Sequence, residues 1–325
     1  MEGQQHKPEA IGREISVRTL KESDLDDVDH IFRQAFGTHI SLSNPTSFGG
    51  DSDPVRTRWL ADPTAAFGAE FDDILVGSIF ATHWGSVGLF GPLSVRPDLW
   101  DRGIAKRLIE PVIELFSKWG ISHGGLFTWA DNAKHIGLYQ KFGFWPRFLT
   151  VIMVKPVGQP KPLLKWSRYS MVPESDRAAC LMACYKLTNF IYEGLDLKRE
   201  IQAVDTQGLG DTVLLWDDVE LVGMAVCHSG QGSEAGSSTC YVKFGVARPG
   251  PTAEHVFTRL LDTCEAFAVA KGMSLIVAGV NTERCQAYRK MMECGFRTQT
   301  QGVAMHRPNE PGYNRTDIYA IDDWR

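Results

Sequence analysis

A loop and the start of a helix at residues 93–108 (LSVRPDLWDRGIAKRL) combine small residues with positive charge. The backbone N–H groups of a helix's first turn have no partner within the helix, and with the helix dipole they favour an anion. Gly103 and Ala105 are small enough to let a pyrophosphate approach these groups closely. The alternative is a helix that begins here without binding any ligand. The predicted anion site consists of Arg102, Gly103, Ile104, Ala105 and Lys106.

A tyrosine farther along the chain could supply acid catalysis. In residues 131–144 (DNAKHIGLYQKFGF), Asn132 and Tyr139 are seven residues apart, which is two helical turns, so both lie on one face. A tyrosine hydroxyl can donate a proton to a leaving group. Tyrosines also commonly pack in protein cores, and the spacing alone does not separate the two roles.

These two segments resemble the motifs of the GNAT superfamily of N-acetyltransferases. The family has a loop of the form Gln/Arg-x-x-Gly-x-Gly/Ala, and residues 100–105 (WDRGIA) are similar, with Trp100 in place of the usual Gln or Arg. The family also has the segment Asn-x-x-Ala-x-x-Leu-Tyr-x-Lys-x-Gly-Phe, in which His135 here replaces the usual alanine. The residues that match this segment are Asn132, Leu138, Tyr139, Lys141, Gly143 and Phe144. The resemblance covers most of residues 15–155.

The resemblance implies that acetyl-CoA is the cosubstrate, that no metal takes part, and that the acetyl group passes directly to an amine. The loop would bind the CoA pyrophosphate, and Asn132 would contact the pantetheine arm. Backbone N–H groups near Leu93, Ser94 and Val95 would polarise the thioester carbonyl, as in an oxyanion hole. Tyr139 would act as the general acid that protonates the leaving thiolate.

The base that removes the amine proton differs among members of this superfamily, and some members rely on water. We expect His83, at the end of a predicted strand, to be the base because imidazole titrates near neutrality. Glu70 is the second candidate. A strand-end histidine without any catalytic role is the alternative interpretation of His83.

The elements that position these residues follow from hydrophobic periodicity. Residues 65–71, 74–84 and 87–95 predict three strands joined by short turns, which is typical of an antiparallel meander. A long loop at residues 37–54 is rich in Ser, Asn, Gly and Pro, and loops of this length are often functional. The other strands expected in this half are 15–19, 125–129, 144–149 and 151–155, and the helices are 25–36, 103–119 and 132–142.

The order of elements repeats after residues 155–162 (KPVGQPKP), whose prolines indicate a linker. Three landmarks recur in the same order, and their elements match, which is typical of a duplicated domain. The landmark pairs are Val76–Gly77 with Val222–Gly223, Asn132 with Asn281, and Gly143–Phe144 with Gly295–Phe296. The strands expected in the second half are 211–216, 220–228, 239–247, 274–280 and 316–321, and helices are expected within 174–202, at 252–271 and from 283.

The predicted fold class is therefore α/β (α+β), with two tandem GNAT-type folds. Each would be a mixed, mostly antiparallel twisted sheet flanked by helices. We expect residues 11–156 to form the domain with the acetyl-CoA site, residues 157–167 to form the linker, and residues 168–325 to form a degenerate second domain.

The second copy resembles the same fold with its chemistry lost. In direct register its loop, residues 246–261 (VARPGPTAEHVFTRLL), places Pro251 at the Gln/Arg position and Glu254 at the position of Gly103. Proline lacks an N–H donor, and a carboxylate repels phosphate. We expect this copy not to bind CoA in the family manner, although Tyr288 keeps the spacing of Tyr139. Its expected role is to complete the acceptor pocket or to stabilise the first copy.

Composition excludes several other classes of protein. The hydrophobic fraction of 43%, the charged fraction of 22% and the net charge of -5 indicate a globular protein without a basic field for nucleic acid. No signal peptide and no apolar run of membrane-spanning length occur, so we expect a cytoplasmic protein without a membrane partner. All seven cysteines lie in the second half at spacings that fit buried thiols better than a zinc site.

The expected function is transfer of an acyl group to a primary amine of a small molecule or peptide, with chemistry in the first domain. A non-catalytic acyl-CoA sensor or scaffold is the alternative, although such a protein would not need Tyr139. A cysteine nucleophile is disfavoured because the first domain has no cysteine.

Residues 230–238 (GQGSEAGSS) are one residue too long for a dinucleotide fingerprint and predict a hairpin loop that could contact the acceptor. Five aromatic residues could line a partly apolar acceptor pocket or belong to the core: Phe36, Phe48, Trp59, Trp84 and Phe90.

Overall fold

Two similar sets of strands and helices follow one another along the chain, and the computed structural model describes residues 15–158 and 166–325. The N-terminal half runs to the end of β6 and the C-terminal half starts at β7. The expected domain start at residue 11 and most of the expected linker at 157–167 lie outside the described residues. The domain boundaries therefore stay a proposal.

The N-terminal half contains the predicted antiparallel meander of β2, β3 and β4. The structure begins β3 and β4 at the predicted residues and also places α2 after the long loop, where no helix was predicted. The elements are β1 (Ile15–Thr19), α1 (Leu25–His39), α2 (Pro54–Ala61), β2 (Ala66–Phe71), β3 (Ile74–Trp84), β4 (Val87–Val95), α3 (Ile104–Trp119), β5 (His123–Thr128), α4 (Ala133–Gln140) and β6 (Trp145–Pro156).

The C-terminal half repeats this order. Its elements are β7 (Ser167–Arg168), α5 (Glu174–Asn189), α6 (Lys198–Gln207), β8 (Gly210–Asp217), β9 (Glu220–Gly230), β10 (Gly236–Ala247), α7 (Ala253–Ala270), β11 (Leu275–Asn281), α8 (Cys285–Glu293), β12 (Arg297–Arg307) and β13 (Ala320–Ile321). Strand β12 was not predicted, because the segment that forms its first half is polar and largely exposed. The predicted strand at 316–321 shrinks to the two residues of β13.

One continuous sheet joins the halves in the order β1-β2-β3-β4-β5-β12-β6-β11-β10-β9-β8-β7, with β13 attached to β10. Most pairs are antiparallel, as predicted, and two pairs within the described residues are parallel. These are β4 with β5 and β10 with β11, at equivalent places in the two halves.

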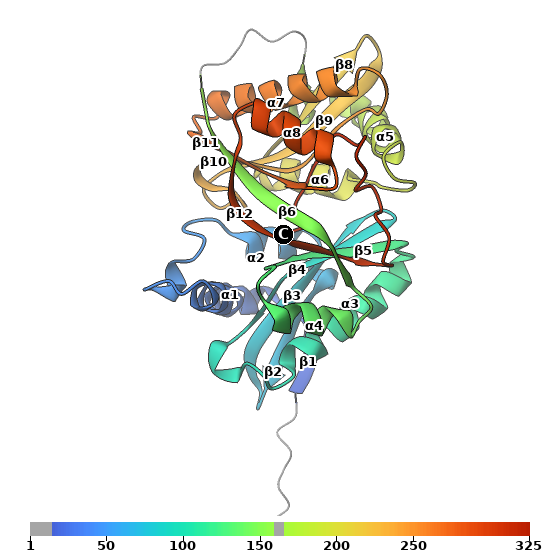
Figure 1. Ribbon diagram of the computed structural model, residues 1–325. Coiled ribbons are helices and arrows are strands. Elements are labelled where there is room, and N and C mark those ends of the chain that lie inside the picture. The colour runs from blue at the N-terminus through green and yellow to red at the C-terminus, as the bar shows by residue number, and fades with distance from the viewer. Residues whose placement is uncertain (1–14, 159–165) are drawn as a thin grey trace, which may run out of the picture.

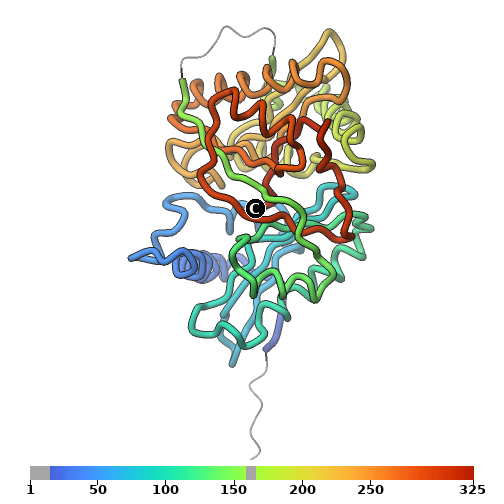
Figure 2. The backbone as a smooth tube through the Cα atoms, viewed as in Figure 1, coloured from blue at the N-terminus to red at the C-terminus, as the bar shows by residue number. Residues whose placement is uncertain are grey.

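The two halves exchange their last long strands. β12 of the C-terminal half pairs with β5 of the N-terminal half, and β6 of the N-terminal half pairs with β11 of the C-terminal half. β6 and β12 also pair with each other from Arg297↔Val154 to His306↔Trp145. Figure 1 shows these two strands, green and dark red, crossing the middle of the molecule side by side, and the tube in Figure 2 follows the same path. We call this arrangement the strand exchange.

Helices cover both faces of each half of the sheet. In the N-terminal half, α3 and α4 enclose one hydrophobic cluster, while α1 and α2 cover the other face through a smaller one. In the C-terminal half, α7 and α8 enclose a third cluster. The fourth cluster includes α5, α6 and residues of both halves, among them Trp84 and Leu89 of the N-terminal half. This shared core packs the halves against each other.

Two loops that the sequence singled out meet at the junction of the halves. Asp51, in the loop before α2, accepts hydrogen bonds from the backbone N–H and the hydroxyl of Ser237 in β10. The backbone N–H of Asp53 donates to the carbonyl of Ser233, which lies in the β9–β10 hairpin loop. The predicted hairpin loop is therefore confirmed, and it contacts the N-terminal half.

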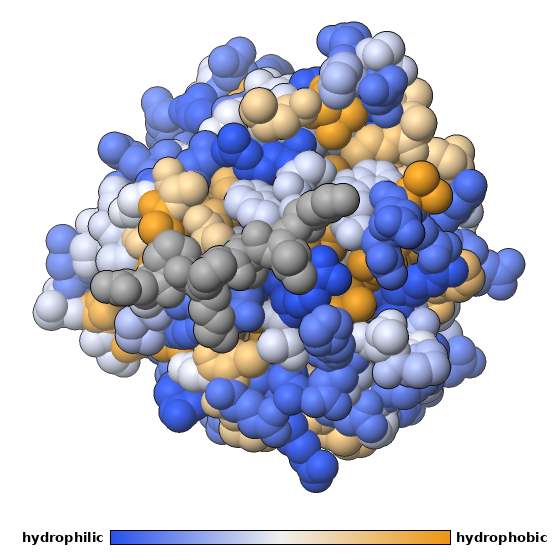
Figure 3. All heavy atoms as spheres, turned by 90° about the horizontal axis from the view of Figure 1, so that it is seen from above, coloured by the Kyte–Doolittle hydropathy of each residue, from blue (hydrophilic) through white to orange (hydrophobic). Residues whose placement is uncertain are grey.

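The outer face of the C-terminal half, seen from above in Figure 3, mixes hydrophilic residues with hydrophobic ones that lie in separate groups. Within the described residues, no helix is long and apolar enough to cross a membrane. All seven cysteines are free thiols, and five of them are buried, as their apolar surroundings predicted.

A buried histidine pair lies where β5 meets β12. Nε2 of His123 is 3.0 Å from Nδ1 of His306, and Nε2 of His306 is 3.3 Å from the amide nitrogen of Asn314. Both rings are fully buried. Burial lowers the pKa of His123 to about 4, and burial together with the neighbouring His123 lowers the pKa of His306 to about 3. Both histidines are therefore neutral at pH 7.

The strand exchange predicts that residues 1–156 do not fold alone. Without β11 and β12, the edge of β5 and both edges of β6 lose their partners, and unpaired edges promote aggregation. We expect this fragment to be insoluble or oligomeric by light scattering, and to become soluble when residues 157–325 are co-expressed. A soluble, monomeric fragment with full activity would show that the C-terminal half is an independent appendage.

The histidine pair predicts a loss of stability in mild acid. A histidine in the unfolded chain takes up a proton below about pH 6.5, whereas these two stay neutral in the folded protein. The stabilisation present above pH 6.5 is therefore lost as the pH falls toward 4. We expect the free energy of unfolding in urea to fall by about 2 kcal/mol per histidine between pH 7.5 and pH 5.

The matched variants are His306→Asn and, as the control, His255→Asn on the exposed face of α7. In His306→Asn, the fall in the free energy of unfolding between pH 7.5 and pH 5 should be about half of the fall that the pair causes in the wild type. In the control, this fall should be unchanged. An unchanged pH dependence in His306→Asn would contradict the assignment of this effect to the pair.

Candidate active site

The predicted anion site lies at the bare N-terminus of α3. Gly103 is the N-cap residue with φ of 80°, a left-handed conformation that glycine adopts without strain. No side chain caps the first turn, and a Cβ at Gly103 would meet nothing within 4 Å. Arg102 and Lys106 are exposed, Ala105 is half-buried, and Ile104 anchors the turn in the core. The first-turn N–H groups are thus accessible to an anion.

Trp100, which departs from the family motif, has a structural role in this loop. Its indole N–H donates to the carbonyl of Val95 at 2.8 Å and so ties the loop to the end of β4. Asp101 forms an exposed ion pair at 2.8 Å with Lys134 in the first turn of α4. The loop is therefore linked to both elements that border the predicted site.

The end of β4 offers an unpaired backbone edge. β5 pairs with β4 only from Val87 to Leu89, and within the described residues no strand covers that edge farther on. Because the N–H of Arg96 donates to β3 and N–H directions alternate along a strand, those of Leu93 and Val95 point to the open edge. Between them, Ser94 faces Ser78 with 3.0 Å between the hydroxyl oxygens.

Tyr139 is buried on α4, and its ring centroid lies 5.8 Å from that of Phe90 on β4. Burial raises the pKa of its hydroxyl well above the usual value, so it stays protonated at neutral pH. Asn132 is the N-cap of α4, and its side-chain oxygen accepts from the N–H of His135 at 3.1 Å. The capping role explains why an asparagine suits this position, and it leaves the amide NH₂ group to meet a ligand.

Two stacked histidines, one of them next to Tyr139, were not singled out as catalytic from sequence. The ring of His135 lies 6.5 Å from that of Tyr139 and stacks on His39, the last residue of α1, at 5.6 Å. His39 also stacks on Trp129, which follows β5. Burial, with the nearby His39 as the next cause, lowers the pKa of His135. Only the fold brings these rings together, because they come from three separate elements.

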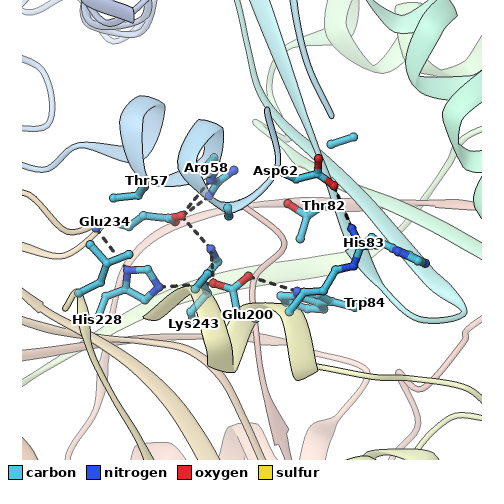
Figure 4. Close-up of a pocket in the computed structure, with 15 residues that line it drawn as sticks. Thr57, Arg58, Asp62, Thr82, His83, Trp84, Glu200, His228, Glu234 and Lys243 are labelled. Atoms are coloured by element: carbon cyan, nitrogen blue, oxygen red, sulfur yellow. Dashed lines mark hydrogen bonds and ion pairs between the residues drawn. The ribbon is translucent and has the colours of Figure 1, made fainter. Parts of the chain in front are cut away.

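A polar cavity of about 40 Å³ lies between the two halves (Figure 4). The N-terminal half contributes residues of α2 and β3, and the C-terminal half contributes residues of α6, β9 and β10 with their hairpin loop. A smaller cavity shares Arg58, Thr82, Trp84 and Lys243 with it and reaches Phe90 and Gly91 of β4. The two cavities therefore adjoin each other, and the smaller one borders the middle of β4.

Four buried charges form a network at this cavity. Arg58 is 2.8 Å from Glu234, and Lys243 is 2.8 Å from both Glu234 and Glu200. Burial opposes ionisation of both carboxyls, but the cations outweigh it, so the pKa of Glu200 falls to about 2 and that of Glu234 lies well below its usual value. The network is neutral overall. His228 completes it at 3.5 Å from Glu200.

The two base candidates differ in their surroundings. His83 lines the inter-half cavity and stacks on Trp119 with 4.6 Å between centroids. Burial and the charge of Arg199 lower its pKa, so its imidazole is neutral at pH 7. Glu70 lies on β2, and its carboxylate accepts a hydrogen bond at 2.7 Å from the guanidinium of Arg18 on β1. Glu70 is therefore already paired with a cation.

The structure divides the predicted site residues into two groups. The loop at residues 100–106 and helix α4, which carries Asn132 and Tyr139, contact each other and β4. His83 lies toward the other end of the β3–β4 hairpin, at the cavity. Three of the aromatic residues proposed for an apolar pocket pack between α1, α2 and the sheet instead: Phe36, Phe48 and Trp59. The charged residues that line the cavity come from distant segments, so no sequence spacing could reveal it.

Comparison with known proteins identifies the class. Residues 26–144 match the sequence model of the acetyltransferase (GNAT) family. The N-terminal half therefore contains a GNAT acetyltransferase domain, as its motifs predicted, and members of this family are acetyl-transferring enzymes. No curated protein matches the chain in sequence.

Solved structures resemble the chain over both halves. A putative acetyltransferase from Pyrococcus horikoshii has a TM-score of 0.69 at 15% identity, with 99% of each chain covered. A GCN5-related N-acetyltransferase from Sphaerobacter thermophilus has a TM-score of 0.58 at 14% identity, covering 90% of this chain and 95% of that one. A glucosamine N-acetyltransferase region of a fungal multi-domain β-N-acetylglucosaminidase has a TM-score of 0.61 at 12% identity, covering 90% and 38%. At these identities the likeness establishes the fold and not the reaction.

The residues around the open edge fit acetyl-CoA, the cosubstrate used by this family. The bare N-terminus of α3 suits a pyrophosphate, and the unpaired edge of β4 can bind an amide-bearing chain as a neighbouring strand would. Within the described residues, no group of three or more potential metal ligands occurs.

A Tyr139→Phe variant should separate the catalytic role of the hydroxyl from the packing role of the ring. The ring would keep its packing against Phe90, so acetyl-CoA affinity should stay within about threefold, while loss of a general acid lowers kcat by roughly 10²–10⁴-fold. Thiol release at saturating substrate measures kcat, and calorimetry measures binding. The matched control is Tyr288→Phe in the C-terminal half, which should leave both values unchanged. Full kcat in Tyr139→Phe would make this tyrosine structural.

Proposed function

We propose that this protein is an acetyl-CoA-dependent N-acetyltransferase that acetylates a primary amine of a small molecule or peptide. The chemistry takes place in the N-terminal domain, for which we keep the boundaries 11–156, with a linker at 157–167 and a second domain at 168–325. The C-terminal half provides one wall of the acceptor site and, through the strand exchange, holds the N-terminal sheet together.

One observation carries this proposal. The uncapped N-terminus of α3 at Gly103 lies beside the unpaired edge of β4 at Leu93 and Val95. The first feature suits the pyrophosphate of CoA, and the second suits the amide-bearing pantetheine arm. Arg102 and Lys106 are exposed at the same loop and add positive charge for the phosphates. Asn132, on the neighbouring helix α4, is the proposed contact for the pantetheine arm.

The acceptor enters through the inter-half cavity. This cavity admits the amine end of a polar molecule, and the smaller cavity next to it reaches Gly91, two residues before Leu93. His83 lines the cavity with a neutral imidazole, which is the form that accepts a proton. We therefore retain His83 as the proposed base, assisted by ordered water if the amine lies farther away.

The proposed step is direct acyl transfer. The amine nitrogen attacks the thioester carbonyl carbon, and the N–H groups of Leu93 and Val95 stabilise the negative charge on the carbonyl oxygen. The new C–N bond forms as the C–S bond breaks. Tyr139 donates its proton to the CoA thiolate, and His83 takes the proton that the amine loses. Solvent then returns a proton from His83 to Tyr139, and the products are free CoA and the amide.

The substitution Gly103→Glu tests the cofactor site. A carboxylate at the bare helix N-terminus should repel the pyrophosphate and lower acetyl-CoA affinity by at least about 100-fold, while wild-type protein binds one molecule per chain. The matched control is Thr252→Glu at the N-cap of α7, which should bind normally. Calorimetry measures binding, and thiol release with a pool of amines measures turnover. Two equivalent sites, or normal binding by Gly103→Glu, would refute the assignment, and binding without any turnover would refute catalysis.

A further inference from the structure

The two halves contain the same strand edge, and hydrogen bonds fix the correspondence. The N–H of Arg96 donates to the carbonyl of Val76 at 2.9 Å, and the N–H of Arg248 donates to the carbonyl of Val222 at 2.7 Å. Val76 and Val222 begin the repeated landmark, so the end of β4 at residues 93–95 corresponds to residues 245–247 of β10. In both halves the parallel pairing stops shortly before this segment, at Leu89 and at Val242.

In the C-terminal half this edge has an occupant from the chain itself. β13 pairs with β10 through Gly245↔Ile321 and Val246↔Ala320, and the N–H of Ala247 donates to the carbonyl of Tyr319 at 3.0 Å. In the N-terminal half, within the described residues, no strand occupies the equivalent edge. The same backbone groups are therefore covered in one half and open in the other.

The occupant is anchored at the helix that corresponds to α3. Thr252 is the N-cap of α7, so it stands where Gly103 stands in α3, and Glu254 lies in the first turn rather than at the glycine position that direct register predicted. The carboxylate of Glu254 accepts a hydrogen bond from the hydroxyl of Tyr319 at 3.3 Å and pairs with Lys290 at 2.6 Å. A carboxylate is thus part of the first turn of α7, whereas the first turn of α3 contains no acidic residue.

A second anchor comes from the helix that corresponds to α4. Arg284, the N-cap of α8, is fully buried and forms two hydrogen bonds, at 3.0 and 3.1 Å, to the carboxylate of Asp322. It also donates to the backbone carbonyl of Asp322 at 3.0 Å. The paired charges fix the segment in the cleft, because separating them would leave a buried charge without a partner.

The packing leaves no room for another ligand. All five residues from Tyr319 to Asp323 are at most 6% exposed. A Cβ on Gly279 of β11 would lie 2.2 Å from the side chain of Asp323, so glycine is required there for the segment to fit. The hydroxyl of Tyr241 donates to Asp323 at 3.0 Å. The segment then continues to Arg325, which lines the smaller cavity together with Gly91.

We propose that residues 319–323 are a built-in occupant of the second cleft and fill the place that an extended amide-bearing chain takes in the first. An acyl-CoA therefore cannot enter the C-terminal half, and the segment instead uses that cleft to position Trp324 and Arg325 as one wall of the acceptor route. The comparison with acetyl-CoA rests on the proposed function, whereas the occupancy of the second cleft does not.

Hydrogen exchange of the full chain, read by mass spectrometry, tests this proposal. In the free protein, the amides of Gly245 and Ala247 should exchange at least about tenfold more slowly than those of Leu93 and Val95, because β13 protects only the first pair. Addition of acetyl-CoA should slow exchange at 93–95 and leave 245–247 unchanged. Equal rates at the two edges of the free protein, or protection of 245–247 by acetyl-CoA, would overturn the proposal.

Variants of the anchors sharpen the test. Arg284→Ala should speed exchange at 245–247 by at least about tenfold without changing 93–95, and Arg284→Lys, which keeps the charge, should have a smaller effect. If Arg284→Ala fails to fold, Tyr319→Phe removes only the hydrogen bond to Glu254 and should change exchange at 245–247 alone. Unchanged exchange in a folded Arg284→Ala would overturn the proposal. Acetyl-CoA that protects neither edge would contradict the proposed function, and the rates in the free protein would still decide this inference.

Discussion

The pairing of β6 with β12 is the interaction on which the rest of the structure depends. Each of these strands leaves the half in which its sequence lies and fills a place in the sheet beside the other half. Neither half of the sheet is complete until both strands are in place, because β12 supplies the neighbour of β5 and β6 supplies the neighbour of β11. Backbone groups left at an open edge would need water or another chain as partner. The two halves are therefore expected to fold as one cooperative unit.

The strand exchange also fixes the surfaces that face each other across the junction. Arg58 comes from α2, Glu200 from α6, and Glu234 and Lys243 from the β9–β10 hairpin. Burying four charges is costly unless each has a partner at short distance, and a loose junction between the halves could not guarantee those distances. The continuous sheet and the shared hydrophobic core supply this rigidity. A polar cavity at the junction can thus exist without destabilising unpaired charges.

Duplication of a fold does not preserve what binds to it. Both halves stop their parallel pairing at the same point and leave backbone groups that need partners. In the C-terminal half a strand of the same chain satisfies them, and Glu254 and Arg284 have side chains that hold this strand. In the N-terminal half, Gly103 leaves the helix N-terminus bare and the edge of β4 stays open. The first turn of α7 thus contains a carboxylate that accepts from a tyrosine hydroxyl, whereas the first turn of α3, our proposed anion site, contains none.

Sequence alone determined the class of the N-terminal half, the meander of β2, β3 and β4, and the loop at Gly103, because these features depend on local spacing and periodicity. It did not predict β12, whose polar first half is stabilised by hydrogen bonds to β6 rather than by burial. Only the tertiary structure decided the strand exchange, the charged cavity and the occupant of the second cleft. The residues that meet in these features lie far apart in the chain. Arg58 and Glu234, for example, are 176 residues apart. Contacts between distant segments leave no periodic signal in a sequence, since either partner alone is an ordinary polar residue.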